Sequence, residues 1–129
     1  MNILVIEDNE QNLYLVRFLL EAHGHQISET RNGPAGIAAA QTAPPDLILL
    51  DIQLPQMDGY AVARALRENP ALAAVPIVAV TSYAMNGDRL LALAAGCDAY
   101  IEKPIDPDSF VTQVEVAAAA GRTQQEGAS

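Results

Sequence analysis

The sequence is poor in cysteine, lysine and long hydrophobic runs, and each shortage excludes something. Cys97 is the single cysteine, so an internal disulfide and a cysteine-built metal site are excluded, and the composition suits a reducing compartment such as the cytoplasm. No run approaches the roughly 18 apolar residues that cross a bilayer, and the first residues lack the charged region of a secretory signal. We therefore expect a cytoplasmic protein without membrane insertion.

Basic residues are scarce as well. The chain has 7 Lys and Arg against 16 Asp and Glu, a formal net charge of −9. Its arginines are scattered, whereas neutralising phosphates needs clustered cations, so nucleic acid is not expected as a direct partner. Lys103 is the only lysine, which reflects either chance or a specific requirement at that position.

The composition that remains is that of one globular domain. Half of the 129 residues are hydrophobic and 18% are charged, which is enough to build a core. Three continuous apolar runs are typical of central parallel strands, and two mixed runs are typical of sheet edges. The expected strands are 3–6, 25–30, 47–50, 76–80 and 98–102, and the expected helices are 9–23, 34–43, 58–68, 86–95 and 106–120.

Residues typical of helix starts and helix ends support this alternation of strands and helices. Asp106 and Pro107 are expected as the N-cap and first-turn proline of the last helix, and Gly24 as the C′ residue of the first. Strands alternating with helices indicate right-handed βαβ units, so we expect a doubly wound α/β domain over residues 1–120. The polar stretch 121–129 is expected to be a frayed tail, and the position of Met1 just before the first strand favours a complete short protein.

Chemistry-bearing residues follow four of the five strands. Ligands bind beyond the carboxyl ends of parallel strands, where the strand order reverses. The residues delivered to that edge are Glu7, Asp8, Asp51, Thr81, Ser82 and Lys103. Carboxylates gathered there repel one another, so the cluster needs a cation or a raised pKa.

Structural roles compete with functional ones at several positions. Asp8 or Asn9 could simply cap the first helix, and Thr81 could be a strand-end hydroxyl bound to the backbone. The His23-x-His25 pair could suggest a metal, but a helix end followed by an edge strand favours surface histidines. Cys97 is expected to be a small packing residue.

Taken together, the strand-end residues suit one reaction. An oxygen-rich pocket is what Mg²⁺ prefers, together with water and phosphate oxygens. A metal-bridged phosphoryl group on Asp51 would have its other oxygens met by Lys103 and by the Thr81 hydroxyl. Asp51 is the acceptor by position, because it follows a central strand while the other acids approach from its neighbour.

At this point the sequence resembles the receiver domains of bacterial two-component response regulators, over essentially residues 2–120. Five motifs carry the resemblance, in order and at the family's spacing: residues 4–9, residues 46–59, Val80-Thr81-Ser82, residues 96–101 and Lys103-Pro104. Within the family it is most similar to the single-domain regulators of the DivK type. The resemblance implies a CheY-like (βα)5, flavodoxin-like fold, with the five-stranded parallel sheet ordered 2-1-3-4-5 and helices on both faces.

The resemblance also implies a metal site. Mg²⁺, for which Mn²⁺ can substitute, would be bound by Asp8, Asp51 and the Gln53 backbone carbonyl, with Glu7 holding a metal-bound water. Glu7 departs from many relatives, which have aspartate there, but keeps the charge. Gln53 and Tyr83 flank the site at positions that vary across the family and tune the lifetime of the phosphoryl group.

Phosphorylation and switching are implied at a further set of positions. Asp51 would carry the phosphoryl group, with Thr81, Ser82 and Lys103 contacting it, and the Lys103–Pro104 peptide would be cis. Thr81 and Tyr100 would form the switch. The surface from the fourth helix through the fifth strand to the fifth helix, residues 86–115, would bind the downstream protein.

Three functions compete. The first is a response regulator, not an enzyme, that takes a phosphoryl group from a sensor histidine kinase or a histidine phosphotransferase and changes its affinity for a protein partner. The second is a pseudo-receiver that binds proteins without phosphoryl transfer, which the loss of an acid, of Thr81 or of Lys103 would favour. The third is a Mg²⁺-dependent phosphohydrolase, but such enzymes place a second acid where this chain has Gln53, and no segment is long enough for a cap. We expect the first function, that of a response regulator.

Overall fold

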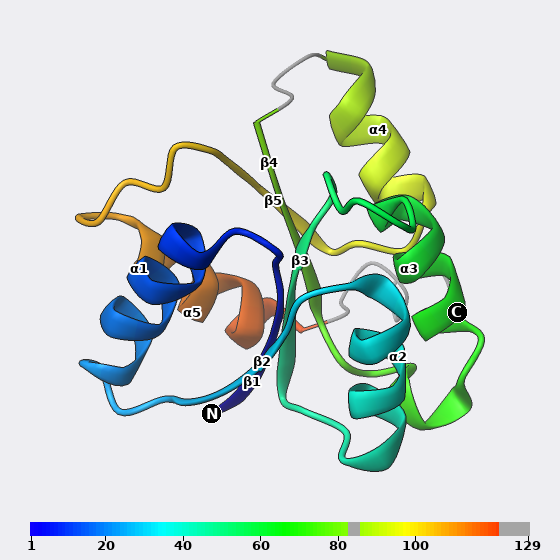
Figure 1. Ribbon diagram of the computed structural model, residues 1–129, viewed down its shortest axis with the longest axis horizontal. Coiled ribbons are helices and arrows are strands. Elements are labelled where there is room, and N and C mark those ends of the chain that lie inside the picture. Colours follow the sequence, from blue (N-terminus) through cyan, green and yellow to red (C-terminus); the bar gives the residue numbers. More distant parts are fainter. Residues whose placement is uncertain (83–85, 122–129) are drawn as a thin grey trace.

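The computed structural model describes residues 1–82 and 86–121, and gives the backbone alone for Asn86 and Gly87. Tyr83 and residues 122–129 of the expected tail lie outside the described residues. Five parallel strands form one sheet in the order β2-β1-β3-β4-β5, which confirms the expected fold and strand order (Figure 1). The strands are β1 (Asn2–Ile6), β2 (Gln26–Thr30), β3 (Leu47–Asp51), β4 (Ile77–Thr81) and β5 (Ala99–Glu102).

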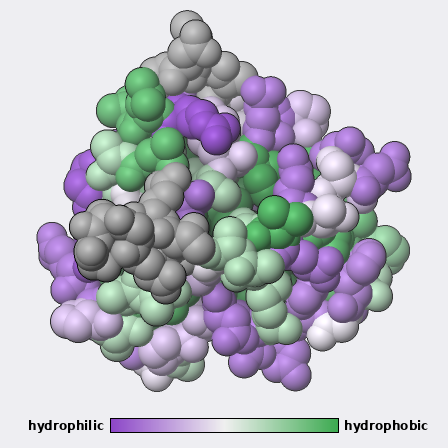
Figure 2. Space-filling view, turned by 180° about the vertical axis from the view of Figure 1, so that it is seen from behind, coloured by the Kyte–Doolittle hydropathy of each residue, from purple (hydrophilic) through white to green (hydrophobic). Residues whose placement is uncertain are grey.

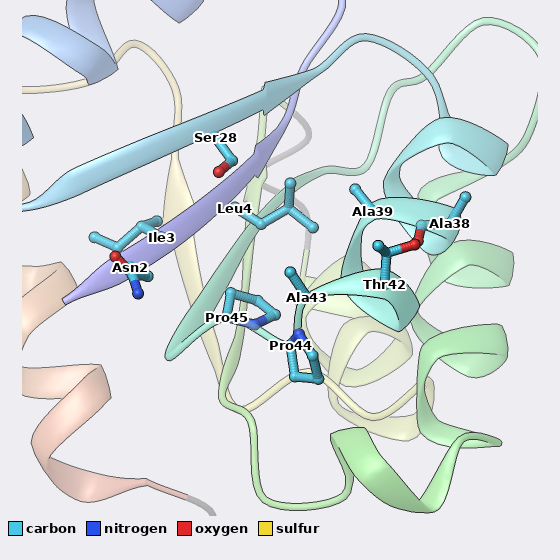
Figure 3. Close-up of a pocket in the computed structure, with 10 residues that line it drawn as sticks. All are labelled: Asn2, Ile3, Leu4, Ser28, Ala38, Ala39, Thr42, Ala43, Pro44 and Pro45. Carbon is cyan, nitrogen blue, oxygen red and sulfur yellow. The ribbon is translucent and has the colours of Figure 1, made fainter.

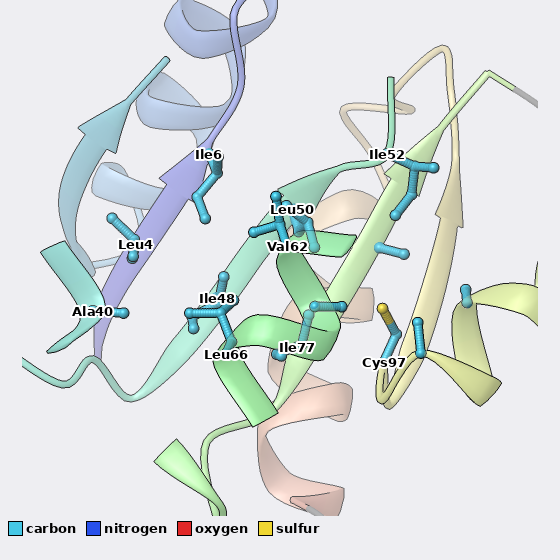
Figure 4. Close-up of a cluster of buried hydrophobic side chains, with 14 of the residues drawn as sticks. Leu4, Ile6, Ala40, Ile48, Leu50, Ile52, Val62, Leu66, Ile77 and Cys97 are labelled. Atoms are coloured by element: carbon cyan, nitrogen blue, oxygen red, sulfur yellow. The ribbon is translucent and has the colours of Figure 1, made fainter. Parts of the chain in front are cut away.

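Helices cover both faces of the sheet. Helices α1 (Glu10–Glu21) and α5 (Phe110–Ala120) pack on one face, and α2 (Gly33–Thr42), α3 (Gly59–Arg67) and α4 (Asn86–Ala94) lie on the other, with the short 3₁₀ helix η1 (Pro70–Leu72) after α3 (Figure 1). Each face has its own apolar core, since alternate side chains of each strand point to opposite sides. Figure 4 shows the core under α2 and α3, where Leu50 and Ile48 of β3 meet Val62 and Leu66 of α3.

One predicted helix start was wrong. α5 begins at Phe110 rather than at Asp106, because residues 107–109 form a turn that leads into the helix: the Asp106 carboxylate accepts the Asp108 N–H at 3.0 Å and the Ser109 hydroxyl at 3.2 Å, and the Asp106 carbonyl accepts the Phe110 N–H at 2.9 Å. Helix α1 ends as expected: the Gly24 N–H donates to the Glu21 carbonyl at 3.0 Å and the His25 N–H to the Leu20 carbonyl at 3.2 Å, and these bonds, with the positive φ of +86° at Gly24, place Gly24 at C′. Both β2 and β5 lie at sheet edges, as their mixed composition indicated.

Of the two histidines expected at the surface, His23 is exposed, whereas His25 is partly buried. Its side chain is only 10% exposed, and Nε2 lies 2.9 Å from Glu115 Oε2 on α5. The residue precedes the edge strand β2, but α5 covers it, so the contact joins two segments far apart in the sequence. Cys97 is buried in the core, as expected of a packing residue.

A half-buried arginine links α3 to the segments that lead into β4 and β5. Arg67, the last residue of α3, donates to the carbonyls of Gly96 at 3.0 Å, Leu72 at 2.9 Å and Val75 at 2.7 Å. It also donates to the Asp98 carboxylate at 2.7 Å, and Asp98 in turn accepts the Ile77 N–H at 2.9 Å. The arginine therefore fixes the start of β4 and the approach to β5 against α3, which sets the positions of their carboxyl ends.

Candidate functional site

The strand order reverses between β1 and β3, and the acidic residues meet at this point. From β1 the chain runs outward to β2 and then returns past β1 to β3. Glu7 and Asp8 directly follow β1, and Asp51 is the last residue of β3. Glu7 and Asp51 are 5% and 3% exposed, whereas Asp8 is open to solvent. The carboxyl edge therefore holds two buried carboxylates and one exposed one.

The first helix is capped by Asn9, not by Asp8. The Asn9 side chain accepts the Asn12 N–H at 3.0 Å, which satisfies a free donor of the first turn. Asp8 is therefore not needed for capping. Glu7 Oε2 accepts the Asn9 N–H at 3.2 Å, so one carboxylate oxygen of Glu7 stays near the helix start.

Three carboxylates and the single lysine form one cluster. Glu7, Asp8 and Asp51 each offer an oxygen, and these oxygens all lie within 4.8 Å of one another. Lys103 Nζ lies 2.9 Å from Glu7 Oε1 and 3.4 Å from Asp51 Oδ2. Three carboxylates and one ammonium leave two negative charges uncompensated when all are ionised. This donor set, made only of hard oxygens with excess negative charge, fits a small divalent cation.

The same crowding changes the protonation of Glu7. Burial is the main cause that raises its pKa to about 7, and the neighbouring Asp51 adds to the effect while Lys103 opposes it. Folded Glu7 therefore keeps its proton up to about pH 7, whereas in the unfolded chain it loses it near the ordinary value of 4.5.

We expect Glu7→Gln to change how the stability of the metal-free protein depends on pH. The raised pKa means that Glu7 contributes stability that is complete below pH 4.5 and is lost as the pH rises through about 7. The free energy of unfolding of Glu7→Gln, relative to wild type, should therefore increase from pH 5 to pH 8. Urea unfolding followed by circular dichroism in a chelator measures it, with the exposed Glu68→Gln as the charge control. A difference that does not vary with pH contradicts this assignment.

Two hydrogen bonds connect the loops around Asp51. The Gln53 N–H donates to Asp51 Oδ1 at 2.8 Å, which orients the carboxylate. The Ser82 N–H donates to Gln53 Oε1, also at 2.8 Å, so the loop after β3 is joined to the loop after β4. The sequence placed Ser82 and Gln53 near the site but gave no sign that the Gln53 side chain binds the Ser82 backbone.

The remaining expected positions occupy the neighbouring strand ends. Thr81 ends β4 and is completely buried, and its carbonyl accepts the Lys103 N–H at 2.7 Å. The Lys103–Pro104 peptide bond is cis. Tyr100 on β5 is half-buried against the core that lies under α3 and α4, and burial raises the pKa of its hydroxyl.

A cavity lies at the opposite end of the sheet, away from the acidic cluster. About 610 Å³ opens between the end of α2, the Pro44–Pro45 stretch and the start of β1 (Figure 3). Small apolar side chains and a few hydroxyl and amide groups line it, with no ionisable side chain. The cavity therefore offers no charged group, unlike the acidic cluster at the carboxyl edge.

The doubly wound sheet and the acidic edge at its switch point together define a CheY-like receiver. The response regulator receiver domain family matches residues 3–115, so the chain belongs to this family of regulatory proteins. Within the described residues, no helix is long and apolar enough to span a membrane.

Individual relatives agree with the family. The polar-differentiation response regulator DivK of Brucella anthropi is 41% identical over 114 residues, which cover 88% of this chain and 93% of that protein. The receiver domain of sensor histidine kinase PA1611 from Pseudomonas aeruginosa, solved with magnesium coordinated in its active-site cleft, is 30% identical with a TM-score of 0.84 and coverage of 92% and 97%. Vibrio cholerae CheY4 shares the fold at 22% identity, with a TM-score of 0.86 and coverage of 90% and 97%.

Proposed function

We propose that the chain accepts a phosphoryl group onto Asp51 from a phosphohistidine of a sensor histidine kinase or a histidine phosphotransferase, and that this changes its affinity for a protein partner. The observation that carries the proposal is the contact of a buried aspartate with the only lysine, 3.4 Å away, beside two further acids at the strand-order switch. The DivK relative, a response regulator by name, supports it.

The transfer uses groups that the chain holds in place. An Asp51 carboxylate oxygen attacks phosphorus, the bond from phosphorus to the donor imidazole breaks, and its electron pair stays on the imidazole nitrogen. The new oxygen–phosphorus bond makes Asp51 a mixed anhydride. The Lys103 ammonium and the Thr81 hydroxyl meet the transferred oxygens, with Ser82 beside them, and so stabilise the charge that builds up during transfer.

The acidic cluster also supports a metal role. Asp8, Asp51 and the Gln53 carbonyl would hold Mg²⁺, with Glu7 acting through a bound water. When bound, the ion supplies positive charge that offsets the carboxylates and the incoming phosphoryl group. Magnesium in the cleft of the Pseudomonas receiver supports this choice. Mn²⁺, which also favours six oxygen ligands, can substitute.

Switching would begin at Thr81. Its hydroxyl, drawn toward the phosphoryl group, would pull the segment that leads into α4, and the Tyr100 ring would move into the space left behind. The output surface would be α4, β5 and α5, residues 86–115. Leu90 and Leu91 of α4 are 69% and 54% exposed, and an apolar patch covers α4 at the upper left of Figure 2, which supports a protein partner there.

The rival functions lack supporting features. A pseudo-receiver would be favoured by a missing acid, threonine or lysine, yet Asp8, Thr81 and Lys103 are all present. A phosphohydrolase would need a second acid in place of Gln53. We therefore propose a non-enzymatic regulator whose receiver unit spans residues 1–120 and which works in the cytoplasm, where histidine kinases present their phosphohistidine.

We expect Thr81→Ala to separate phosphoryl binding from switching. With Mg²⁺ and beryllofluoride, a phosphoryl mimic, wild type should show chemical-shift changes at Asp51, along α4 and at Tyr100. Thr81→Ala should keep the changes near Asp51 and lose the distant ones, because the hydroxyl that pulls the loop is gone. Thr42→Ala, at the far end of α2, is the matched control. Distant shifts that persist in Thr81→Ala at saturation exclude this route.

A further inference from the structure

Few buried side chains hold helix α4 against the sheet. Among its described side chains only Ala92 is buried, whereas α3 buries Val62, Ala63 and Leu66. The element against which α4 packs most is the edge strand β5. Elements with few buried apolar contacts open most easily, so any additional anchor has a large influence on where α4 lies.

One such anchor comes from α3. Tyr60 Oη donates to the backbone carbonyl of Asp88, in the first turn of α4, at 3.3 Å. The Tyr60 ring is half-buried against the core, and burial, with the nearby Asp88 charge, raises the pKa of its hydroxyl. The hydroxyl therefore stays protonated at neutral pH and remains a donor.

The base of this tyrosine is fixed to the strand that carries Asp51. A Cβ at Gly59 would lie 2.4 Å from the Ile52 Cα, so the start of α3 touches the residue that follows Asp51. The Gly59 N–H donates to the Ile52 carbonyl at 3.2 Å, and the Asp58 side chain caps the helix by accepting the Tyr60 N–H at 2.9 Å. Tyr60 thus reaches from a rigid base at the end of β3 to a weakly held α4.

We propose that Tyr60 is a positioning residue that holds the first turn of α4 in the unphosphorylated state and so sets how readily phosphorylation moves α4. The inference rests on the proposed function, in which Thr81 pulls the segment leading into α4. Displacing that first turn must break the Tyr60 hydrogen bond. A contact present in only one of two states biases the equilibrium toward that state, so its removal must favour the phosphorylated conformation and everything that binds it.

The test is Tyr60→Phe, which removes the hydroxyl and keeps the ring. Loss of one hydrogen bond changes an equilibrium constant by about twofold to tenfold. Hydrogen exchange of the α4 amides, measured by mass spectrometry without phosphoryl mimic, should speed up by that factor while the central strands stay unchanged. The affinity for beryllofluoride with Mg²⁺ should rise by a similar factor. Tyr14→Phe, an α1 tyrosine that is 72% exposed, is the matched control.

The two measurements, hydrogen exchange of α4 and beryllofluoride affinity, distinguish a failure of this inference from a failure of the proposed function. Unchanged α4 exchange in Tyr60→Phe overturns the holding role, and unchanged or weaker beryllofluoride affinity overturns the bias toward the unphosphorylated state. If wild type itself binds no beryllofluoride, the proposed function fails, and α4 exchange alone then supports or overturns the hold that Tyr60 exerts.

Discussion

Asp51→Asn is expected to abolish phosphorylation of the protein. The neutral amide lacks the carboxylate oxygen that would attack phosphorus, and the other two acids of the cluster, Glu7 and Asp8, follow β1 and are proposed to serve the metal ion instead. The fold should survive, because asparagine has the same shape and its oxygen can still accept the Gln53 N–H. Incubation with acetyl phosphate and Mg²⁺ followed by intact mass should show one added phosphoryl group in wild type and none in the variant.

A matched control lies just before the other end of the same strand. Asp46 precedes β3 at its amino end and accepts the Asn2 N–H at 2.7 Å, far from the acidic edge. Asp46→Asn should therefore be phosphorylated like wild type. Equal phosphate incorporation in Asp51→Asn would place the acceptor elsewhere, and loss in both variants would point to a general effect on the fold.

The largest loss of stability is expected from Arg67→Met. The Arg67 and Asp98 side chains are only 13% and 9% exposed, and the arginine serves three carbonyls besides the carboxylate. Removing one member of a buried ion pair leaves the other charge buried, which costs about 3–5 kcal/mol of unfolding free energy. Because the chain has no tryptophan, urea unfolding should be followed by circular dichroism.

An exposed ion pair provides the control for Arg67→Met. The Arg31–Glu10 pair joins side chains that are 48% and 74% exposed, so Arg31→Met should cost no more than about 1 kcal/mol. Replacing Asp98 by leucine in the Arg67→Met background should recover part of the loss, since the unpaired charge is then gone. Equal losses for Arg67→Met and Arg31→Met would show that the buried network contributes little.

The fold and the membership of the site followed from local patterns. Continuous apolar runs such as Leu47–Leu50 specify central strands, and parallel strands must bring their carboxyl ends to one edge. The residue directly after or at the end of each run could therefore be assigned to the edge without knowing any contact. This is why Glu7, Asp51 and Lys103 were expected together, and the structure brings them within ion-pair distance.

Interactions that depend on tertiary distances could not be predicted in this way. Arg67 binds the Gly96 carbonyl and the Asp98 carboxylate, which lie 29 and 31 residues further along the chain, and no local pattern around Arg67 marks these contacts. His25 precedes a polar edge strand, but its partner Glu115 is 90 residues away on a helix whose placement the local pattern does not give. The start of α5 was misjudged because Asp106 has the same capping preference in an isolated turn as at a helix start.

Protonation at the acidic edge belongs to the same class of unpredictable features. The sequence shows that the carboxylates must repel one another, but it does not show which of them has its pKa raised. The structure assigns the raised pKa to Glu7, chiefly through burial. Metal affinity should consequently weaken as the pH falls below about 7, because protonated Glu7 no longer adds its negative charge to the cluster.

The central claim is that Asp51 carries the phosphoryl group, and locating the modification in the wild-type chain tests it most directly. After phosphorylation with acetyl phosphate and Mg²⁺, borohydride reduces an aspartyl phosphate to homoserine, which peptide mass spectrometry can place in the sequence. The account predicts homoserine at position 51 and at no other aspartate. Homoserine at Asp8 or at any other position, or its absence from a chain that has gained phosphate, would contradict it.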